Sequence, residues 1–372
     1  MHIICDKQVL NDALSICLHA VSGKSMIEAL EGVLITAGAK TVTITGYDMQ
    51  MSIEKSFECQ SIETGSCIIN ARIFFDIIRK MRGDEVDISV DHDLNAVISC
   101  GRSVFNIKAE DASEFPSLPE VSSKSGITLP SNTLRSMIND TIFAISTNEN
   151  KPVHMGTLFE TENGVLSLIS VDGYRLAVRK EEIKGLDTSK TAGFVVPGTT
   201  LRELSRIMPD SDEEVTIYPE KRHGMFSFGS VTVITRLLEG EFLNYRTAVP
   251  GDMPICLQIN KNELQEAVER VSLIISERLR NPVRCLFDGD NLNLSCITAL
   301  GKSFDSIPIP FCPEKIEIGF NNKYLLDALK ACPDGEVKLY LKSALSPCVL
   351  KPLEGESFLY LVLPVRLKAE EV

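Results

Sequence analysis

The sequence lacks any apolar run long enough to span a membrane. Its 372 residues are 44% hydrophobic and 24% charged, and no uninterrupted apolar stretch approaches the roughly 18 residues that a membrane helix needs. Residues 1–6 combine neither a basic start nor a long apolar segment, so we expect no secretory signal. The composition excludes a membrane protein and a disordered chain, and it predicts a folded cytoplasmic protein.

Cysteine pairs at metal-binding or redox spacing are also missing. The 11 cysteines are scattered between Cys5 and Cys348, and no two of them form a C-x-x-C motif. An odd number of cysteines without this spacing argues against a disulfide framework and against a structural zinc site. We expect small, buried, reduced side chains instead.

The motifs of common enzyme classes are absent as well. Residues 23–25 and 301–303 resemble the end of a phosphate-binding P-loop, but the glycine required five positions earlier is Leu18 in one case and Cys296 in the other. There is no G-x-S-x-G or H-E-x-x-H motif, and no two of the five histidines lie at metal-ligand spacing. The sequence therefore predicts neither an enzyme nor a cofactor or metal site.

Positive charge is scarce. Lysine and arginine number 38 against 51 aspartates and glutamates, which gives a net charge of −13. A protein that grips DNA over most of its surface is usually basic. Net charge does not show, however, whether a minority of basic side chains lines one face.

What the sequence does contain is an internal repeat. An amphipathic segment with a polar capping residue opens each third of the chain, at residues 5–14, 130–138 and 260–268. A second helix is predicted at residues 70–81, 197–208 and 321–332. An acidic turn and an alternating strand follow it in each copy, at residues 85–90, 214–218 and 336–341. Self-similarity at this period predicts three tandem domains.

Further strands are predicted between the two helices of each copy. They are joined by hairpin turns at residues 37–40, 162–164 and 288–290. Each copy is therefore expected to be an α+β domain with two helices packed on antiparallel sheet. The expected domains are residues 1–122, 127–250 and 253–372, with polar linkers between them.

Basic residues recur at equivalent positions of the second helices. All three copies carry one at the same place, at Arg79, Arg206 and Lys330. Arg72 and Lys323 match in two copies, and Arg202 adds to the set. Any one of these residues is readily explained as solvated helix surface. Their recurrence in an acidic chain favours a symmetric basic lining that faces one common partner.

Helix count limits the size of an assembly with such a lining. If both helices of each domain face one centre, a single chain contributes six. At roughly 9–10 Å between neighbouring axes, six helices close a ring of roughly 18 Å, which is too narrow for duplex DNA. Twelve helices from two chains close a ring of roughly 35 Å, which passes a duplex and a layer of water. A head-to-tail dimer is the smallest closed assembly that we expect.

Three segments of the chain resemble blocks of one known family. The family motif T-D-G-H-R-L-A is similar to residues 171–177, and its terminal Y-V-V-M-P-M-R-L is similar to residues 360–367. A third block is similar to residues 101–105 followed by 114–118. The family is the bacterial DNA polymerase III beta subunit, the sliding clamp, and the likeness covers the full chain.

The resemblance implies a DNA polymerase processivity factor without catalytic activity. It implies a homodimeric ring of six similar domains that encircles duplex DNA non-specifically and is loaded by an ATP-driven clamp loader. A hydrophobic pocket between the second and third domains would receive peptides from the replicative polymerase and other clamp-motif proteins. The residues expected in this pocket are Val171, Gly173, Tyr174, Arg175, Leu176, Leu243, Thr247, Ala248, Val362, Leu363, Pro364, Val365 and Arg366.

The resemblance also assigns DNA contacts and a dimer interface. For DNA it adds Lys24, Asn148 and Lys151 to the repeated basic residues. For the interface it implies an edge strand of one copy against the third domain of the other. The interface residues expected are Phe105, Ile107, Ile274, Ile275 and Leu279.

Two further expectations concern these surfaces. Ile274 and Ile275 are an apolar pair on an otherwise charged helix, so we expect another surface to cover them. Pro364 is expected to keep a neighbouring strand from pairing there, which would leave an apolar patch exposed with arginine at its edge.

Several residues depart from the family pattern. Tyr174 replaces a histidine, Val171 a threonine and Leu243 a proline. Thr247 stands where an arginine is common, and His154 where a leucine is common. These changes affect which peptides the pocket prefers.

Two other functions stay open at this stage. A three-repeat interaction scaffold without a nucleic-acid partner would share the fold and would not need a basic lining. A cytosolic enzyme with a dispersed site would instead show a polar pocket with perturbed titratable groups.

Overall fold

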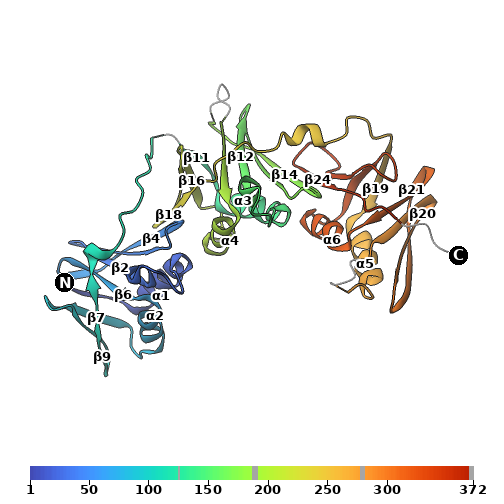
Figure 1. Cartoon of the computed structure of the whole chain (residues 1–372). Coiled ribbons are helices and arrows are strands. Elements are labelled where there is room, and N and C mark those ends of the chain that lie inside the picture. Colours follow the sequence, from blue (N-terminus) through green and yellow to red (C-terminus); the bar gives the residue numbers. More distant parts are fainter. Residues whose placement is uncertain (125, 187–191, 277–280, 368–372) are drawn as a thin grey trace. The chain divides into compact units, whose positions relative to one another are not determined.

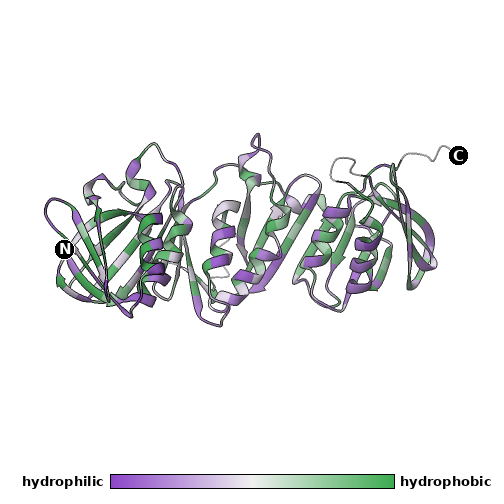
Figure 2. Ribbon diagram, turned by 90° about the horizontal axis from the view of Figure 1, so that it is seen from below, coloured by the Kyte–Doolittle hydropathy of each residue, from purple (hydrophilic) through white to green (hydrophobic). Residues whose placement is uncertain are grey.

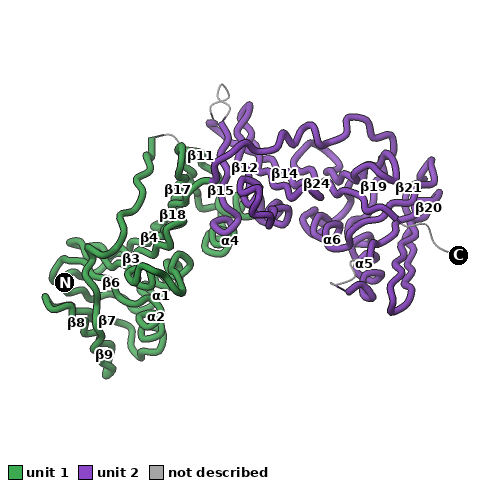
Figure 3. The backbone as a smooth tube through the Cα atoms, viewed as in Figure 1, with its two compact units in different colours: residues 1–135, 202–237 green, residues 136–201, 238–372 purple. Residues whose placement is uncertain are grey.

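A computed structural model describes residues 1–124, 126–186, 192–276 and 281–367. The chain forms two compact units, residues 1–135 with 202–237 and residues 136–201 with 238–372 (Figure 3). The central repeat therefore contributes to both units. The expected α+β architecture, with helices packed on antiparallel sheet, is confirmed. No helix in the described part of the chain is long and apolar enough to cross a membrane.

The described residues contain six α-helices, two for each predicted repeat (Figure 1). They are α1 Lys7–Cys17, α2 Ala71–Lys80, α3 Ser131–Asn139, α4 Gly198–Ile207, α5 Lys261–Ser272 and α6 Asn322–Ala331. Each overlaps the segment that the periodicity of the sequence predicts.

Side-chain caps fix where several helices begin. The carboxylate of Asp6 accepts a hydrogen bond from the amide of Val9 at the start of α1. The amide oxygens of Asn70 and Asn321 accept equivalent bonds at the starts of α2 and α6. Each cap satisfies an amide that has no partner within its helix. The polar residue ahead of the apolar stripe is therefore a correct start signal for these three helices.

The first unit holds two antiparallel sheets. A five-stranded sheet has the order β5-β1-β7-β8-β9, and a nine-stranded sheet has the order β10-β6-β2-β3-β4-β18-β17-β16-β11. The strands are β1 His2–Asp6, β2 Gly32–Ala37, β3 Thr41–Tyr47, β4 Met51–Glu58, β5 Gln60–Glu63, β6 Gly65–Asn70, β7 Glu85–Val90, β8 Asn95–Cys100, β9 Ser103–Lys108, β10 Glu110–Asp111, β11 Ile127–Pro130, β16 Glu214–Pro219, β17 His223–Phe228 and β18 Val231–Arg236. Helices α1 and α2 pack against each other and against strands of the larger sheet.

The second unit holds an eight-stranded and a two-stranded antiparallel sheet. The larger has the order β15-β12-β13-β14-β24-β23-β22-β19, and the smaller pairs β20 with β21. The strands are β12 Gly156–Glu162, β13 Val165–Val171, β14 Arg175–Glu182, β15 Ala192–Pro197, β19 Ile255–Asn260, β20 Val283–Thr298, β21 Gly301–Phe320, β22 Glu336–Leu341, β23 Cys348–Lys351 and β24 Phe358–Val362. Strands of both units alternate hydrophobic and hydrophilic residues, as expected for sheets with one buried face (Figure 2).

Consecutive repeats are joined by the same kind of strand pairing. In the first unit, β18 of the central repeat pairs antiparallel with β4 of the first repeat. In the second unit, β24 of the third repeat pairs antiparallel with β14 of the central repeat. Within the described residues, β9 pairs with β8 alone and residues 301–308 of β21 pair with β20 alone. The strand of each kind that pairs between consecutive repeats thus stays unpaired in the first repeat, at β9, and in the third, at residues 301–308 of β21.

Two local expectations are wrong. Residues 288–290 were expected to form a hairpin turn but lie within β20, where the register shifts and Gly289 has φ 57°. Helix α5 ends at Ser272, so Ile274 and Ile275 follow the helix instead of lying on it. The amphipathic spacing continues past Ser272 in the sequence, and it therefore hid the end of the helix.

The backbone of β3 approaches the end of α1 closely at Gly46. A Cβ atom at this position would lie 2.3 Å from the carbonyl oxygen of Cys17. We expect Gly46→Ala to destabilise the first unit by about 1–3 kcal/mol, because backbone atoms would have to shift. Urea unfolding should show this as a lower midpoint for the first unit.

Gly38→Ala is the matched control. Its Cβ atom would lie 3.4 Å from the nearest atoms of Thr41, an ordinary contact distance. Its effect should stay within about 0.5 kcal/mol. Equal midpoints for the two variants would show that the contact at Gly46 relaxes freely.

Candidate nucleic-acid and peptide interfaces

The repeated basic residues of the second helices lie on the surface. Arg79, Arg206 and Lys330 are 54%, 62% and 56% exposed in their side chains. Arg79 pairs with Asp76 at 2.7 Å, and Arg206 pairs with Glu203 at 2.9 Å. Exposed ion pairs of this kind contribute little stability. The cations of these pairs can therefore release their carboxylate partner and bind a phosphate instead.

The loop residue Lys24 lies beside the second helix of its own repeat. A Cβ atom on the neighbouring Gly23 would be 2.9 Å from Nη2 of Arg72. The structure therefore brings together two of the expected DNA contacts that are far apart in sequence. All nine of these expected residues have exposed side chains: Lys24, Arg72, Arg79, Asn148, Lys151, Arg202, Arg206, Lys323 and Lys330.

Arg175 is buried, which differs from the expected arginine edge of the pocket. Only 8% of it is exposed, and its Nε donates to Asp172 at 2.9 Å. Its Nη1 donates to Asp327 of α6 at 2.5 Å. The guanidinium carbon lies 4.4 Å from the ring centroid of Tyr324 and 5.4 Å from that of Phe143. Arg175 thus ties the turn between β13 and β14 to helix α6.

The other expected pocket residues divide into a buried floor and an exposed rim. Val171, Leu176 and Val362 are 5%, 2% and 1% exposed, so they belong to the core. Tyr174, Leu243 and Val365 are 61%, 43% and 38% exposed. The remaining expected residues with exposed positions are Gly173, Thr247, Ala248 and Arg366, while Leu363 and Pro364 are half-buried.

Regular strand pairing ends at Val362, two residues before Pro364, as expected. The amide of Leu363 donates to the carbonyl of Tyr174, and the amide of Val365 donates to that of Gly319, both at 2.8 Å. The backbone therefore bonds to one neighbour before the proline and to another after it. Gly319 permits this course, because a Cβ atom there would lie 2.8 Å from the carbonyl oxygen of Val365.

Sequence reasoning missed two residues at this site. Tyr324 stacks on Tyr174 with ring centroids 6.0 Å apart, and Asp327 holds Arg175. A signal for Asp327 was present, because it occupies the same repeat position as Asp76 and Glu203. No signal marked Tyr324, since an aromatic residue on an amphipathic helix is usually core.

His154 lies against the apolar wall of this region. Its ring contacts that of Phe242 edge to face with centroids 5.3 Å apart, and Phe242 packs on the cluster that contains Val171 and Leu176. Burial, and secondarily the charge of Lys151, lower the pKa of His154 below its ordinary value. The folded protein therefore favours the neutral imidazole.

The expected interface residues lie on two separate elements. Phe105 and Ile107 are on β9, the edge strand of its sheet, and Phe105 is 40% exposed. Beyond α5, Ile274 is half-buried and Ile275 packs against the core of the third repeat. Leu273 is the side chain exposed there, at 83%, and sequence reasoning missed it. Leu279 lies outside the described residues.

Family models match nearly the whole chain. The DNA polymerase III beta subunit N-terminal domain matches residues 1–119, the central domain residues 128–244 and the C-terminal domain residues 246–366. The expected organisation as three tandem domains of this type is confirmed.

Individual proteins agree with the family models. The beta sliding clamp of Staphylococcus epidermidis is 34% identical over 367 residues, covering 96% of each chain. A DNA polymerase III beta subunit from Eubacterium rectale is 34% identical with a TM-score of 0.95, covering 99% of this chain and 100% of that one. The sliding clamp of Bacillus subtilis is 29% identical with a TM-score of 0.95 and the same coverage.

The lowered pKa of His154 makes a prediction about stability. Stability from the neutral ring is complete above the unfolded pKa of about 6.5 and is lost as pH falls through the lower folded pKa. His154→Gln should therefore flatten the fall of Tm between neutral pH and about pH 5. Scanning calorimetry across this range measures the effect.

His92→Gln is the control, because the His92 side chain is 89% exposed. It should leave the pH dependence of Tm as in the unmodified protein. If His154→Gln also leaves it unchanged, the buried ring is not the group that titrates.

Proposed function

Because this chain belongs to the DNA polymerase III beta subunit family, we propose that it is a sliding clamp, a ring that encircles duplex DNA and tethers the replicative polymerase. The observation that carries this function is the match of three family domains in tandem along the whole chain. A scaffold without a nucleic-acid partner is not favoured, because the same match extends to every repeat. The domain limits we propose are residues 1–122, 127–250 and 253–372.

We propose that two copies close the ring by the strand pairing that already joins the repeats within one chain. Strands β9, β18 and β24 occupy equivalent places in the three repeats, each as the third strand of the meander that follows the second helix. In the ladders that these strands form with β8, β17 and β23, the residues Phe105, Val233 and Tyr360 occupy equivalent positions. Two residues later, the equivalent positions are Ile107, Thr235 and Val362.

The internal pairings supply a register for the contact between copies. Thr235 pairs with Met51 and Val362 pairs with Arg175. Met51 is the first residue of β4, and Arg175 is the first residue of β14. The corresponding strand of the third repeat, β21, begins at Gly301. Ile107 of one copy should therefore lie opposite Gly301 of the other.

In this register, exposed apolar side chains of the two copies lie opposite each other. Val104 of one copy would lie opposite Phe304 of the other, and these are 57% and 71% exposed in the single chain. Apolar side chains left exposed near these two edges are Ile73 and Phe105 in the first repeat, and Leu273 and Leu300 in the third. Large exposed apolar surfaces mark protein interfaces. The partner for this surface is a second copy of the chain.

For DNA, we propose contacts to phosphates only. The exposed cations of the second helices, together with Lys24 and Lys151, are suited to the duplex backbone. Base readout would fix the protein at one sequence, whereas a clamp has to slide. Breaking an exposed ion pair such as Arg79–Asp76 costs little free energy. Such cations suit phosphate contacts that form and break repeatedly.

For partners, we propose a peptide pocket over the junction of β14 and β24. The rim would be formed by Tyr174, Leu243 and Val365, which are exposed and apolar in part. An apolar concavity of this kind suits a peptide with Leu or Phe anchors and a polar flank. The proposal includes a clamp loader as partner, action in the cytoplasm and no catalytic activity.

Phe304→Glu combined with Leu273→Glu should convert the dimer to a folded monomer. Both side chains are exposed in the single chain, so the substitutions do not disturb its core. Two charges at the interface should raise the dimer dissociation constant at least roughly thirtyfold. Analytical ultracentrifugation and circular dichroism measure assembly and folding separately.

Phe311→Glu is the matched control. Phe311 lies on the same strand and is 68% exposed, but it is outside the stretch that the register pairs with β9. It should remain a dimer. A dimer for Phe304→Glu with Leu273→Glu, or a monomer for Phe311→Glu, would show that ring closure uses another surface.

Deleting residues 363–372 should abolish peptide binding and leave the dimer intact. The deletion removes Leu363 and Val365 with their bonds to the turn at Tyr174 and to Gly319. Loss of such anchors typically costs about 2 kcal/mol each, so affinity should fall at least roughly thirtyfold. Fluorescence polarisation with a labelled peptide carrying Leu and Phe anchors measures it. Deleting residues 368–372 should change affinity little, and normal binding by the longer deletion would place the partner site elsewhere.

A further inference from the structure

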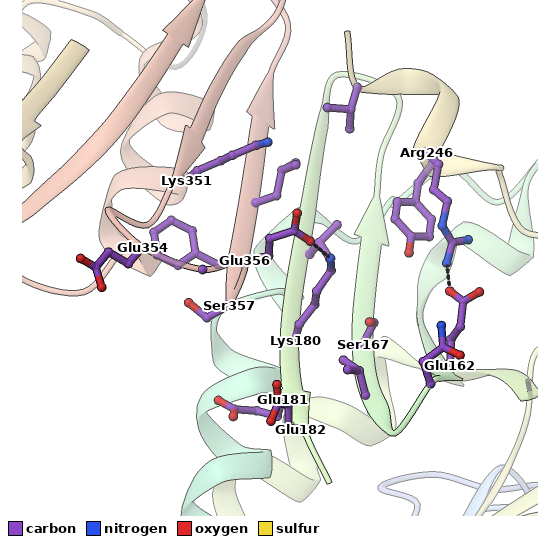
Figure 4. Close-up of a pocket in the computed structure, with 18 residues that line it drawn as sticks. Glu162, Ser167, Lys180, Glu181, Glu182, Arg246, Lys351, Glu354, Glu356 and Ser357 are labelled. Atoms are coloured by element: carbon purple, nitrogen blue, oxygen red, sulfur yellow. Dashed lines mark hydrogen bonds and ion pairs between the residues drawn. The ribbon is translucent and has the colours of Figure 1, made fainter. Parts of the chain in front are cut away.

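A groove separate from the peptide pocket lies on the eight-stranded sheet of the second unit. It has a volume of about 820 Å³ and is walled on one side by Tyr245, Arg246 and Val249, in and just after a short 3-10 helix (Figure 4). Glu162 belongs to this wall through its ion pair with Arg246, and residues 354–357 line the other side of the groove (Figure 4). None of the residues assigned to the peptide pocket lines this groove. The two sites share strands β14 and β24 and lie at opposite ends of these strands.

The floor of the groove is apolar and crosses four strands. Val165, Val178 and Leu359 line it from β13, β14 and β24, and Lys351 of β23 extends it. Neighbouring strands lie about 4.8 Å apart, so the floor accommodates roughly four or five residues of an extended chain. Val178 and Leu359 are paired directly in the β14–β24 ladder. Val178 is only 2% exposed, so half-buried Leu359 supplies most of the apolar surface near the middle of the floor.

The cations that line the groove already have partners. Lys180 pairs with Glu356 at 2.7 Å, and Arg246 donates to Glu162 at 2.8 Å. Lys351 lies 5.5 Å from the ring centroid of Tyr340. Lys351 forms no ion pair within the described residues, so it is the cation of the lining that lacks a carboxylate partner.

The acidic side chains are in excess and two of them are free. The lining contains five glutamates against three cations. Within the described residues, neither Glu182 nor Glu354 forms an ion pair, and both side chains are exposed. Glu182 ends β14, and Glu354 lies in the turn between β23 and β24. The two free carboxylates thus belong to different borders of the apolar floor.

We propose that this groove binds an extended basic segment of a partner protein, with an apolar side chain between two cations. The apolar side chain would pack on Val178 and Leu359, and the cations would pair with Glu182 and Glu354. The excess of carboxylates repels phosphate groups, so nucleic acid does not suit this site. The proposal is independent of the sliding-clamp function, because it rests on the lining of the groove alone.

The probe is the peptide acetyl-Arg-Gly-Leu-Gly-Arg-amide, added to full-length protein with labelled valine and leucine methyl groups. Saturable NMR shifts are expected at the methyl groups of Val165, Val178 and Leu359. Replacing both free carboxylates, Glu182→Gln with Glu354→Gln, should weaken binding about fivefold or more, as expected for two exposed ion pairs. The peptide acetyl-Glu-Gly-Leu-Gly-Glu-amide should not bind.

Asp290→Asn with Glu314→Gln is the control, because it makes the same change in net charge with exposed residues outside the groove. It should bind the basic peptide as the unmodified protein does. The proposal is overturned if the three methyl groups do not shift at millimolar basic peptide. It is also overturned if the Glu182→Gln with Glu354→Gln variant binds with unchanged affinity, or if the acidic peptide binds equally well.

Discussion

Antiparallel pairing between the last strand of one repeat and an exposed strand of the repeat before it is the interaction on which the rest of this structure depends. It occurs twice within the chain, at β4 with β18 and at β14 with β24. Each such pairing buries two edges that would otherwise invite aggregation. Because every repeat carries both kinds of edge, a chain of three leaves one of each kind open. A contact between copies that follows the same rule pairs both of these open edges.

An acidic residue at the same position of α4 and α6 supports these junctions. Glu203 accepts from Nδ1 of His19 at 2.6 Å, which ties α4 to the first repeat, and Asp327 accepts from Arg175, which ties α6 to the central repeat. The same helices expose cations one turn further on, at Arg206 and Lys330. The helices thereby combine a bond that fixes their position with charges that face solvent. The proposed peptide pocket and the acidic groove both involve the β14–β24 junction, so the pairing that builds the fold also positions the two surfaces that we propose for partners.

Much of the fold could be predicted from the sequence, because the same helices and strands recur in each repeat. Helix caps, periodicity and the recurrence of Arg79, Arg206 and Lys330 in the sequence predict the helices and the three domains. The predictions fail where a single local contact determines the end of a helix or the burial of a side chain. Helix α5 ends at Ser272, which exposes Leu273 and turns Ile275 toward the core. Arg175 is buried because Asp172 and Asp327 meet it from two sides. The acidic groove could not be predicted, since its walls come from segments far apart in the chain.

As a sliding clamp, the protein holds DNA by enclosing it. The most direct measurement loads the protein, with a clamp loader, onto nicked circular DNA and separates bound from free protein at a salt concentration that abolishes ordinary phosphate contacts. Protein should remain with the circle, because screening weakens ion pairs but does not open a closed ring. Cutting the circle at one site should release the protein, because the ring then slides off the ends. Equal retention on circular and linear DNA would contradict the claim.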